Sequence, residues 1–244
     1  WVDPDLGCFS DDYVGCDTTR SLAYVYNVDE FDGTAEGSCQ CDLGVFTYCE
    51  RIPLLGVDYF RGPRDENGEE IGMSSFIYLN RTTPGNPPPG TLDPNTGEQY
   101  YRVLQGIWPD GFPLQEGGDG YDEGSAPESR YAFPDPPDLE GGWSMSQEAL
   151  GVGDRRTVQA SGPFTLVPGA VNELIIGVVW VPDQTHPSPS IRRLQAADDL
   201  AQDLFDNCFD LLDGPDAPDV DGIELDNELV AILSNPPEPI SNIF

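Results

Sequence analysis

The sequence predicts a mainly β protein, an antiparallel β-sandwich with long Gly-, Pro- and Asp-rich loops and one C-terminal α-helix. Gly (27) and Pro (24) together form about a fifth of the 244 residues, a share that favours many turns over long helices. Short runs of aromatic and β-branched residues recur between the turns, as they do in strands. Only the segment 190–212 repeats its apolar residues near the helical period of 3.6.

Three strands are expected in the first third of the chain, the last two of them on either side of a tight turn. Residues 21–27 (SLAYVYN) and 54–60 (LLGVDYF) have the aromatic and β-branched composition of strands. The dipeptide Asn67-Gly68 favours a two-residue hairpin turn. Residues 71–80 are therefore the expected return strand.

The second half is expected to hold the centre of the sheet and the helix. Segment 100–108 (YYRVLQGIW) predicts a strand, and so does Phe164–Val167 after a Gly-Pro turn. The run 173–181 (ELIIGVVWV) is almost continuously apolar, which predicts a central strand buried on both faces. The helix at 190–212 has Ser190 as its expected N-cap.

The charge limits the partners. There are 44 acidic residues against 11 basic ones, giving a net charge of −33. No basic patch exists to neutralise phosphates, so nucleic acid is excluded as a partner, and an anionic membrane surface would repel the chain. No apolar run of 18 residues is present, so no membrane span is expected. The composition indicates adaptation to a salty medium, calcium loading or both, with an ordinary acidic secreted protein as the alternative.

Three acidic clusters are candidate Ca²⁺ sites, because Ca²⁺ takes 6–8 oxygen ligands from carboxylates, carbonyls and water. Their spacing does not match an EF-hand loop, so the prediction rests on composition. The alternative is that these aspartates form turns and solvated surface. The candidate ligands are Asp3, Asp5, Asp11, Asp12 and Asp17 in the first cluster, Asp29 and Asp32 in the second, and Asp119 and Asp122 in the third.

An even number of cysteines predicts disulfides in a secreted chain. Cys8 and Cys16 can close a short loop around Asp11 and Asp12, whereas Cys39 and Cys41 are expected to have different partners. Zinc is a weaker alternative, because no pair of C-x₂-C units is present. The six candidates are Cys8, Cys16, Cys39, Cys41, Cys49 and Cys208, the last of them on the apolar face of the predicted helix.

Several short motifs, taken together, resemble a module of large secreted proteins of Bacteroidota-type bacteria that are exported by the type IX secretion system. The resemblance implies a secreted, extracellular or cell-surface location and implies no active site. The cysteine-rich insert at 39–52 departs from that pattern. The motifs are DLGCFSDDYVGCDTTRSLAYVYN (5–27), GVDYFRGP (56–63), MSSFIYLN (73–80), YYRVLQGIWPDG (100–111), GDRRTVQASGPFTLVPG (153–169) and LFDNCFD (204–210).

Three regions follow from these patterns. Residues 1–212 form the β-sandwich module with its terminal helix, and 213–220 are a linker. Residues 221–244 form a partial β segment whose start resembles the opening strands of a fibronectin type III-like domain. A lone pair of strands is marginally stable. We therefore expect this segment to pack on the main domain or to add a strand to other domains or copies of the protein.

Two functions remain open, since no motif of a known catalytic site is present. The first is a non-catalytic structural or interaction module of a secreted cell-surface protein or extracellular assembly, such as a filament or adhesin, stabilised by Ca²⁺ and disulfides. The alternative is a carbohydrate-binding or glycan-processing module. Its site would lie among Tyr100, Trp108, Tyr121, Trp143 and the loop Asp119–Glu123, although aromatic residues beside these acidic loops are more often caps at the ends of a sandwich core.

Overall fold

The computed structural model confirms a mainly β fold with antiparallel sheets and a C-terminal helix. The chain divides into two compact units, Trp1–Asp203 and Leu204–Phe244. The predicted linker lies outside the described residues, apart from its last two positions. The structure describes residues 1–34, 39–42, 46–81, 86–182 and 184–209, together with the backbone of 219–225 and 228–234.

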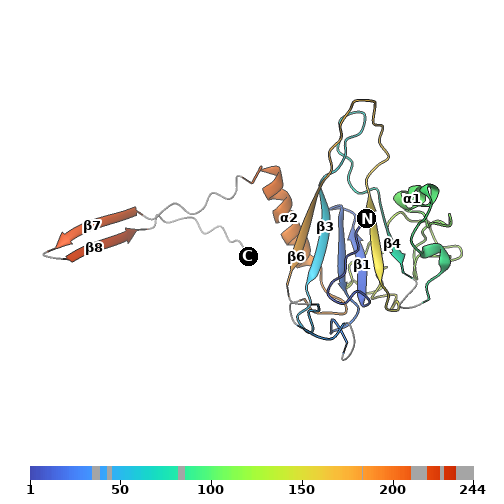
Figure 1. Ribbon diagram of the computed structural model, residues 1–244, viewed down its shortest axis with the longest axis horizontal. Coiled ribbons are helices and arrows are strands. Elements are labelled where there is room, and N and C mark those ends of the chain that lie inside the picture. The colour runs from blue at the N-terminus through green and yellow to red at the C-terminus, as the bar shows by residue number, and fades with distance from the viewer. Residues whose placement is uncertain are drawn as a thin grey trace. The chain divides into compact units, whose positions relative to one another are not determined.

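The larger sheet has four antiparallel strands in the order β1-β2-β3-β6 (Figure 1). Val14 and Val25 are register partners in β1 and β2, and both belong to the core that this sheet shares with the second sheet. The prediction of strands at 21–27 and 54–60 is confirmed. The strands are β1 (Asp12–Asp17), β2 (Leu22–Asn27), β3 (Leu54–Arg61) and β6 (Ile175–Val181).

The second sheet pairs β4 (Ser75–Asn80) with β5 (Arg155–Ala160), with Ile77 opposite Val158. Both residues belong to the same hydrophobic core as the larger sheet. A tight turn forms next to the predicted position: the Gly68 amide donates to the Asp65 carbonyl, so the central residues of the turn are Glu66 and Asn67 and not the predicted pair Asn67-Gly68. However, β3 and β4 join different sheets, so this turn does not close a hairpin between them.

Residues 100–108 are not a strand, and this prediction is wrong. The helix α1 (Gly97–Leu104) occupies most of the segment, after a short 3₁₀ turn at Pro89–Thr91. Thr96 caps α1 in a reciprocal capping box with Gln99. This start signal satisfies free amides of the first helical turn, and it outweighs the strand preference of the two tyrosines.

Two other strand predictions need correction. No strand forms at Phe164–Val167, which lies between Pro163 and Pro168, residues that have no amide hydrogen to donate to a ladder. Strand β6 exists, but it lies at the edge of its sheet and not at the centre. Its buried and exposed residues alternate, so only one face is covered.

The predicted C-terminal helix is confirmed as α2 (Arg192–Asp206). Its Leu194 side chain lies close to Gly56 of β3, where an added Cβ would meet it at 3.3 Å. Arg20 ties the helix further by donating to Asp199 at 2.7 Å. Among the described residues, no helix is long and apolar enough to cross a membrane.

The second unit contains an antiparallel hairpin of β7 (Asp219–Leu225) and β8 (Glu228–Ser234). The two strands are in register from Asp219 opposite Ser234 to Leu225 opposite Glu228. The partial β segment predicted at 221–244 contains β8 and most of β7, whose first two residues lie in the predicted linker, and the residues from 235 lie outside the described part.

Candidate functional site

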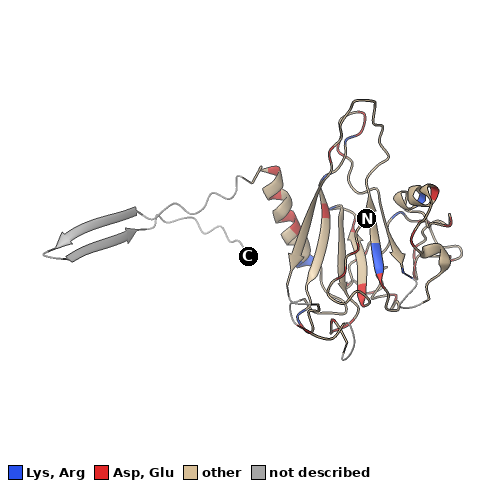
Figure 2. Ribbon diagram, in the orientation of Figure 1, with Lys and Arg blue, Asp and Glu red and all other residues tan. Residues whose placement is uncertain are grey.

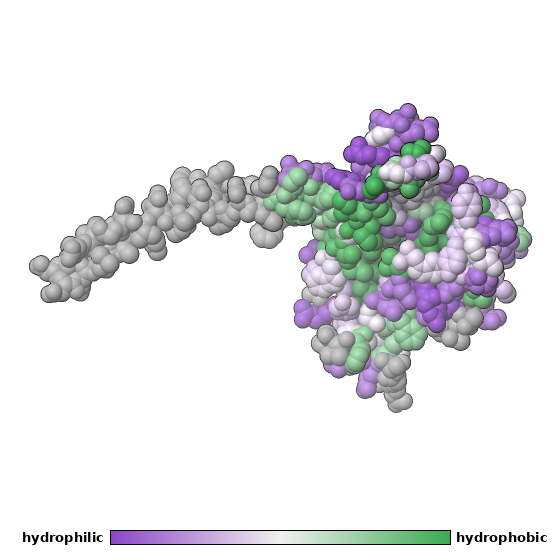
Figure 3. Space-filling model, turned by 45° about the horizontal axis from the view of Figure 1, so that its top comes forward, coloured by the Kyte–Doolittle hydropathy of each residue, from purple (hydrophilic) through white to green (hydrophobic). Residues whose placement is uncertain are grey.

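Strand β6 presents an apolar, exposed face at the edge of the larger sheet. Ile176, Val178 and Trp180, which we call the β6 stripe, have exposed fractions of 55%, 65% and 49%. They alternate with the buried Gly177 and Val179, because successive side chains of a strand point to opposite faces. Figure 3 shows a hydrophobic band over β6 and the neighbouring β3.

The β6 stripe is exposed because the cover over this face of the sheet thins toward the edge. In one row of register partners, Val25 of β2 is buried, Leu55 of β3 is half-buried and Trp180 is exposed. Strand β5 covers the inner strands, and its Gln159 Nε2 donates to the Val57 carbonyl at 3.2 Å. In the part of the chain that the structure describes, no strand pairs with the outer edge of β6.

An edge strand of this kind favours pairing with another chain. Its outer backbone N–H and C=O groups form a template for a further strand, and proteins usually protect such edges with charges or proline. The β6 sequence, IIGVVWV, contains neither. Contiguous exposed apolar surface commonly marks an interaction site.

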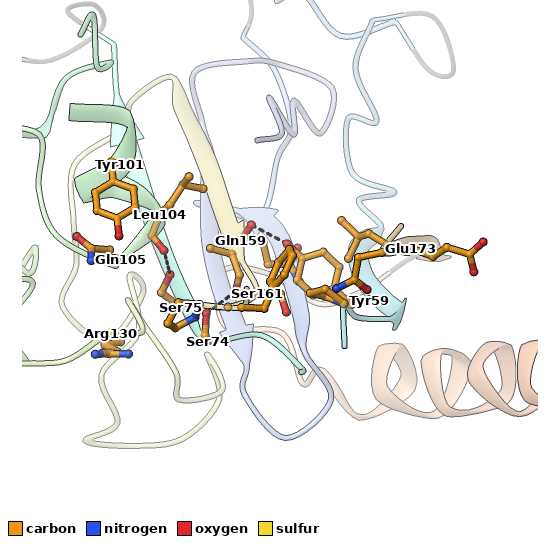
Figure 4. Close-up of a pocket in the computed structure, with 17 residues that line it drawn as sticks. Tyr59, Ser74, Ser75, Tyr101, Leu104, Gln105, Arg130, Gln159, Ser161 and Glu173 are labelled. Atoms are coloured by element: carbon orange, nitrogen blue, oxygen red, sulfur yellow. Dashed lines mark hydrogen bonds between the residues drawn. The ribbon is translucent and has the colours of Figure 1, made fainter. Parts of the chain in front are cut away.

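A cleft of about 610 Å³ adjoins the β6 stripe. It lies between α1 on one side and the ends of β3 and β6 on the other, with β4 and β5 between them (Figure 4). Tyr59 connects the two features, because it lines the cleft and is the register partner of Ile176. Leu174, immediately before β6, lines the same wall.

The structure divides the first acidic cluster. Asp11 and Asp12 are buried near Asp32, a member of the second predicted cluster. The amides of Gly33 and Leu6 donate to one oxygen each of Asp11 and Asp12, at 3.2 and 3.0 Å. Among the described residues, their Oδ1 atoms have no hydrogen-bond partner. Burial, the largest cause, raises the pKa of Asp11 to about 6 and that of Asp12 well above its ordinary value.

Asp3 and Asp5 instead join Asp154, with one oxygen of each within 4.8 Å of the others. Arginines already contact this exposed group: Arg156 Nε lies 3.1 Å from Asp3, and Arg81 Nε lies 3.7 Å from Asp154. These ion pairs reduce the repulsion that a cation would otherwise relieve.

The remaining candidate ligands have separate local roles. Asp17 pairs with Arg20 at 2.9 Å. Asp29 and Asp119 each accept a hydrogen bond from the amide two residues later, as turn-forming aspartates do. Asp122 lies in a left-handed turn. The nine candidates therefore do not converge on one site.

The disulfides differ from the suggested Cys8–Cys16 loop. Cys8 pairs with Cys39, and Cys41 pairs with Cys49, so Cys39 and Cys41 do have different partners. Cys16 remains a free thiol in the core, donating toward the Ala132 carbonyl, because its position in β1 points it inward. Cys208 is also a free thiol and is exposed, so it does not tie the helix back. These pairings leave no cysteine cluster for zinc.

The aromatic residues of the carbohydrate hypothesis do not form a sugar-stacking surface. Trp108 and Trp143 are buried, and their indole N–H groups donate to the carbonyls of Gly120 and Gly118. Tyr121 is half-buried against Trp108, and only Tyr100 is exposed. Trp108 and Trp143 therefore belong to the hydrophobic core, and Tyr121 packs against it.

Sequence reasoning missed a buried carboxyl pair between β3 and α2. Asp58 and Asp198 are each 2% exposed, and the Oδ1 atom of each has no hydrogen-bond partner in the part of the chain that the structure describes. Burial followed by the charge of Asp58 raises the pKa of Asp198 to about 7, and burial raises that of Asp58 to about 6. The available signal was an aspartate within an otherwise apolar strand. Its partner on the helix could not be found without the fold.

The comparisons with known proteins supply no relative. No family model matches the chain, and neither a curated protein nor a solved structure matches it.

Proposed function

We propose that this chain is a non-catalytic interaction module of a secreted cell-surface protein or extracellular assembly, and that it binds a second chain along β6. The observation that carries the proposal is the exposed β6 stripe on an unprotected edge strand. Strand addition would pair the backbone of β6 and cover the apolar side chains of the stripe.

The donor that we propose is the β7–β8 hairpin of another copy. The β8 sequence ELVAILS is almost entirely apolar. A two-stranded hairpin is marginally stable on its own, so it gains from joining a larger sheet. Each copy would thereby supply one donor and one acceptor, which is the arrangement needed for a chain of subunits.

An extracellular location suits the covalent structure. Two disulfides cross-link the segment from Cys8 to Cys49, and such bonds persist mainly in oxidising compartments.

Ca²⁺ binding is part of the same proposal. The unpartnered oxygens of the buried Asp11 and Asp12 are the ligands that this hard cation prefers.

The test is sedimentation velocity of the full chain over a range of concentrations in about 1 M NaCl, where charge repulsion is screened. We expect concentration-dependent association that Val178→Lys abolishes, because a charge on an edge strand opposes pairing. Val171→Lys is the matched control, since Val171 is 87% exposed in the loop before β6.

Deletion of residues 213–244 separates the two parts of the proposal. If the deletion abolishes association, the hairpin is supported as the donor. If the shortened chain still associates, another strand is the donor. A chain that stays monomeric at every concentration, or a Val178→Lys variant that associates like the wild type, contradicts binding along β6.

A further inference from the structure

The cleft beside β6 has properties of a ligand site that the proposed association does not use. Its volume of about 610 Å³ lies within the range of small-molecule sites, roughly 300–1,000 Å³. Its walls include exposed apolar side chains from two separate parts of the fold. Tyr101 and Leu104 come from α1, and Phe164 and Leu174 come from the segment between β5 and β6.

The polar groups of the cleft floor are already satisfied within the protein. Ser75 Oγ donates to the Leu104 carbonyl at 3.0 Å, and Ser161 Oγ donates to the Ile71 carbonyl at 2.8 Å. The Tyr59 hydroxyl donates to the Gln159 carbonyl at 2.6 Å. The floor therefore offers no free hydroxyl donor to a peptide backbone, and it suits an apolar body.

One end of the cleft differs. Arg130 and Gln105 lie there, on the α1 side in Figure 4. Among the described residues, the Arg130 guanidinium has no ion-pair or hydrogen-bond partner, although the chain has 44 acidic residues. The opposite end carries Glu173, which pairs with Arg61 at 3.5 Å. A guanidinium at one end of an apolar cleft is complementary to an elongated molecule with one anionic end.

We propose that the cleft binds a small amphiphilic monocarboxylate, with its carboxylate on Arg130 and Gln105 and its apolar body between α1 and the Phe164–Leu174 segment. Arg130 would hold the carboxylate by charge-assisted hydrogen bonds. The apolar body would cover the exposed side chains of both walls. This site lies beyond the proposed pairing along β6 and does not depend on it.

The probe is decanoate, titrated calorimetrically into the full-length chain in about 1 M NaCl, which screens the net negative charge. We expect saturable binding of one decanoate, and binding of decanol at least about tenfold weaker because it lacks the carboxylate. Shortening the ligand by one buried CH₂ should weaken binding about fourfold.

Arg130→Gln should weaken decanoate binding by at least about tenfold, whereas Arg192→Gln, at an exposed arginine of α2 outside the cleft, should leave it unchanged. Phe164→Asp, which adds a negative charge to one wall, should abolish it. Both altered cleft side chains are exposed, so the fold should persist, and circular dichroism checks this.

No saturable binding of decanoate overturns the proposal. Equal affinity of wild type and Arg130→Gln also overturns it, because binding would then be adventitious contact with apolar surface. Val178→Lys separates the two surfaces, since it should leave decanoate binding intact whether or not the chain associates along β6.

Discussion

At the scale of single residues, the buried pair Asp58 and Asp198 makes the docking of α2 sensitive to pH. Neither carboxyl forms an ion pair with any residue that the structure describes, and the nearby Arg20 pairs with Asp17 and Asp199. Two carboxylates in a buried site repel each other unless a proton or cation intervenes. The charged groups that act on Asp198 are therefore Asp58, Asp199, Asp17 and Arg20.

The sign follows from the raised pKa values. Between the ordinary pKa near 3.8 and the folded value of about 7 for Asp198, the folded state holds a proton that the unfolded state has released. The free energy of unfolding therefore falls as pH rises through this window. Asp198→Asn removes this titration, so it should be close to wild type near pH 5 and more stable than wild type near pH 8.

Urea unfolding followed by tryptophan fluorescence at the two pH values measures this difference. Asp199→Asn is the matched control, because Arg20 lowers the pKa of Asp199 and its loss should destabilise the fold at both values. A constant difference between Asp198→Asn and wild type across pH would show that the pair does not titrate in this range.

At the scale of elements, α1 shows how a local cap decides a conformation. Thr96→Ala removes the side chain that accepts from the Gln99 amide. It should reduce the free energy of unfolding by about 1 kcal/mol, as measured by urea unfolding. Thr165→Ala, at an exposed loop position, should be nearly neutral. Equal effects of the two substitutions would rule out a specific contribution of the cap.

The same element marks a limit of sequence reasoning. Two adjacent tyrosines favour a strand, and only the Thr96 and Gln99 pair three residues apart indicates the helix start. Strand β6 marks another limit. A continuous apolar run does not show whether both faces of the strand are buried or one apolar face is exposed. Only the pairing order reveals the exposed face, and that face is the candidate interaction site.

Contacts between distant segments were equally hidden. The cysteine content predicted disulfides, but only the fold shows that Cys8 pairs with Cys39 and that Cys16 is a buried free thiol. The end of the cleft combines Gln105, after α1, with Arg130 from the following loop. The composition predicted the acidic character of the chain. Only the fold shows which aspartates form ion pairs and which have buried oxygens without a hydrogen-bond partner among the described residues.

At the scale of the whole molecule, a net charge of −33 opposes the compact state, and salt relieves this repulsion without any specific site. Figure 2 shows acidic residues on strands, loops and α2 alike. A specific effect of Ca²⁺ must therefore be measured at constant high ionic strength. Asp11 and Asp12 are the positions where it should act, because their buried Oδ1 atoms have no hydrogen-bond partner within the described residues.

Thermal unfolding in about 1 M NaCl, with EDTA and then with millimolar Ca²⁺, tests this expectation. A ligand at about 100 times its Kd stabilises the folded state by roughly 2.7 kcal/mol, which should raise the Tm by several degrees. Asp12→Asn should remove the shift, whereas Asp122→Asn in the exposed loop should retain it. A shift that matched extra NaCl reproduces, or that Asp12→Asn retains, would mean that screening alone stabilises the fold. The acidic residues would then adapt the whole surface to salt, and the two disulfides would hold the Cys8–Cys49 segment without a cation.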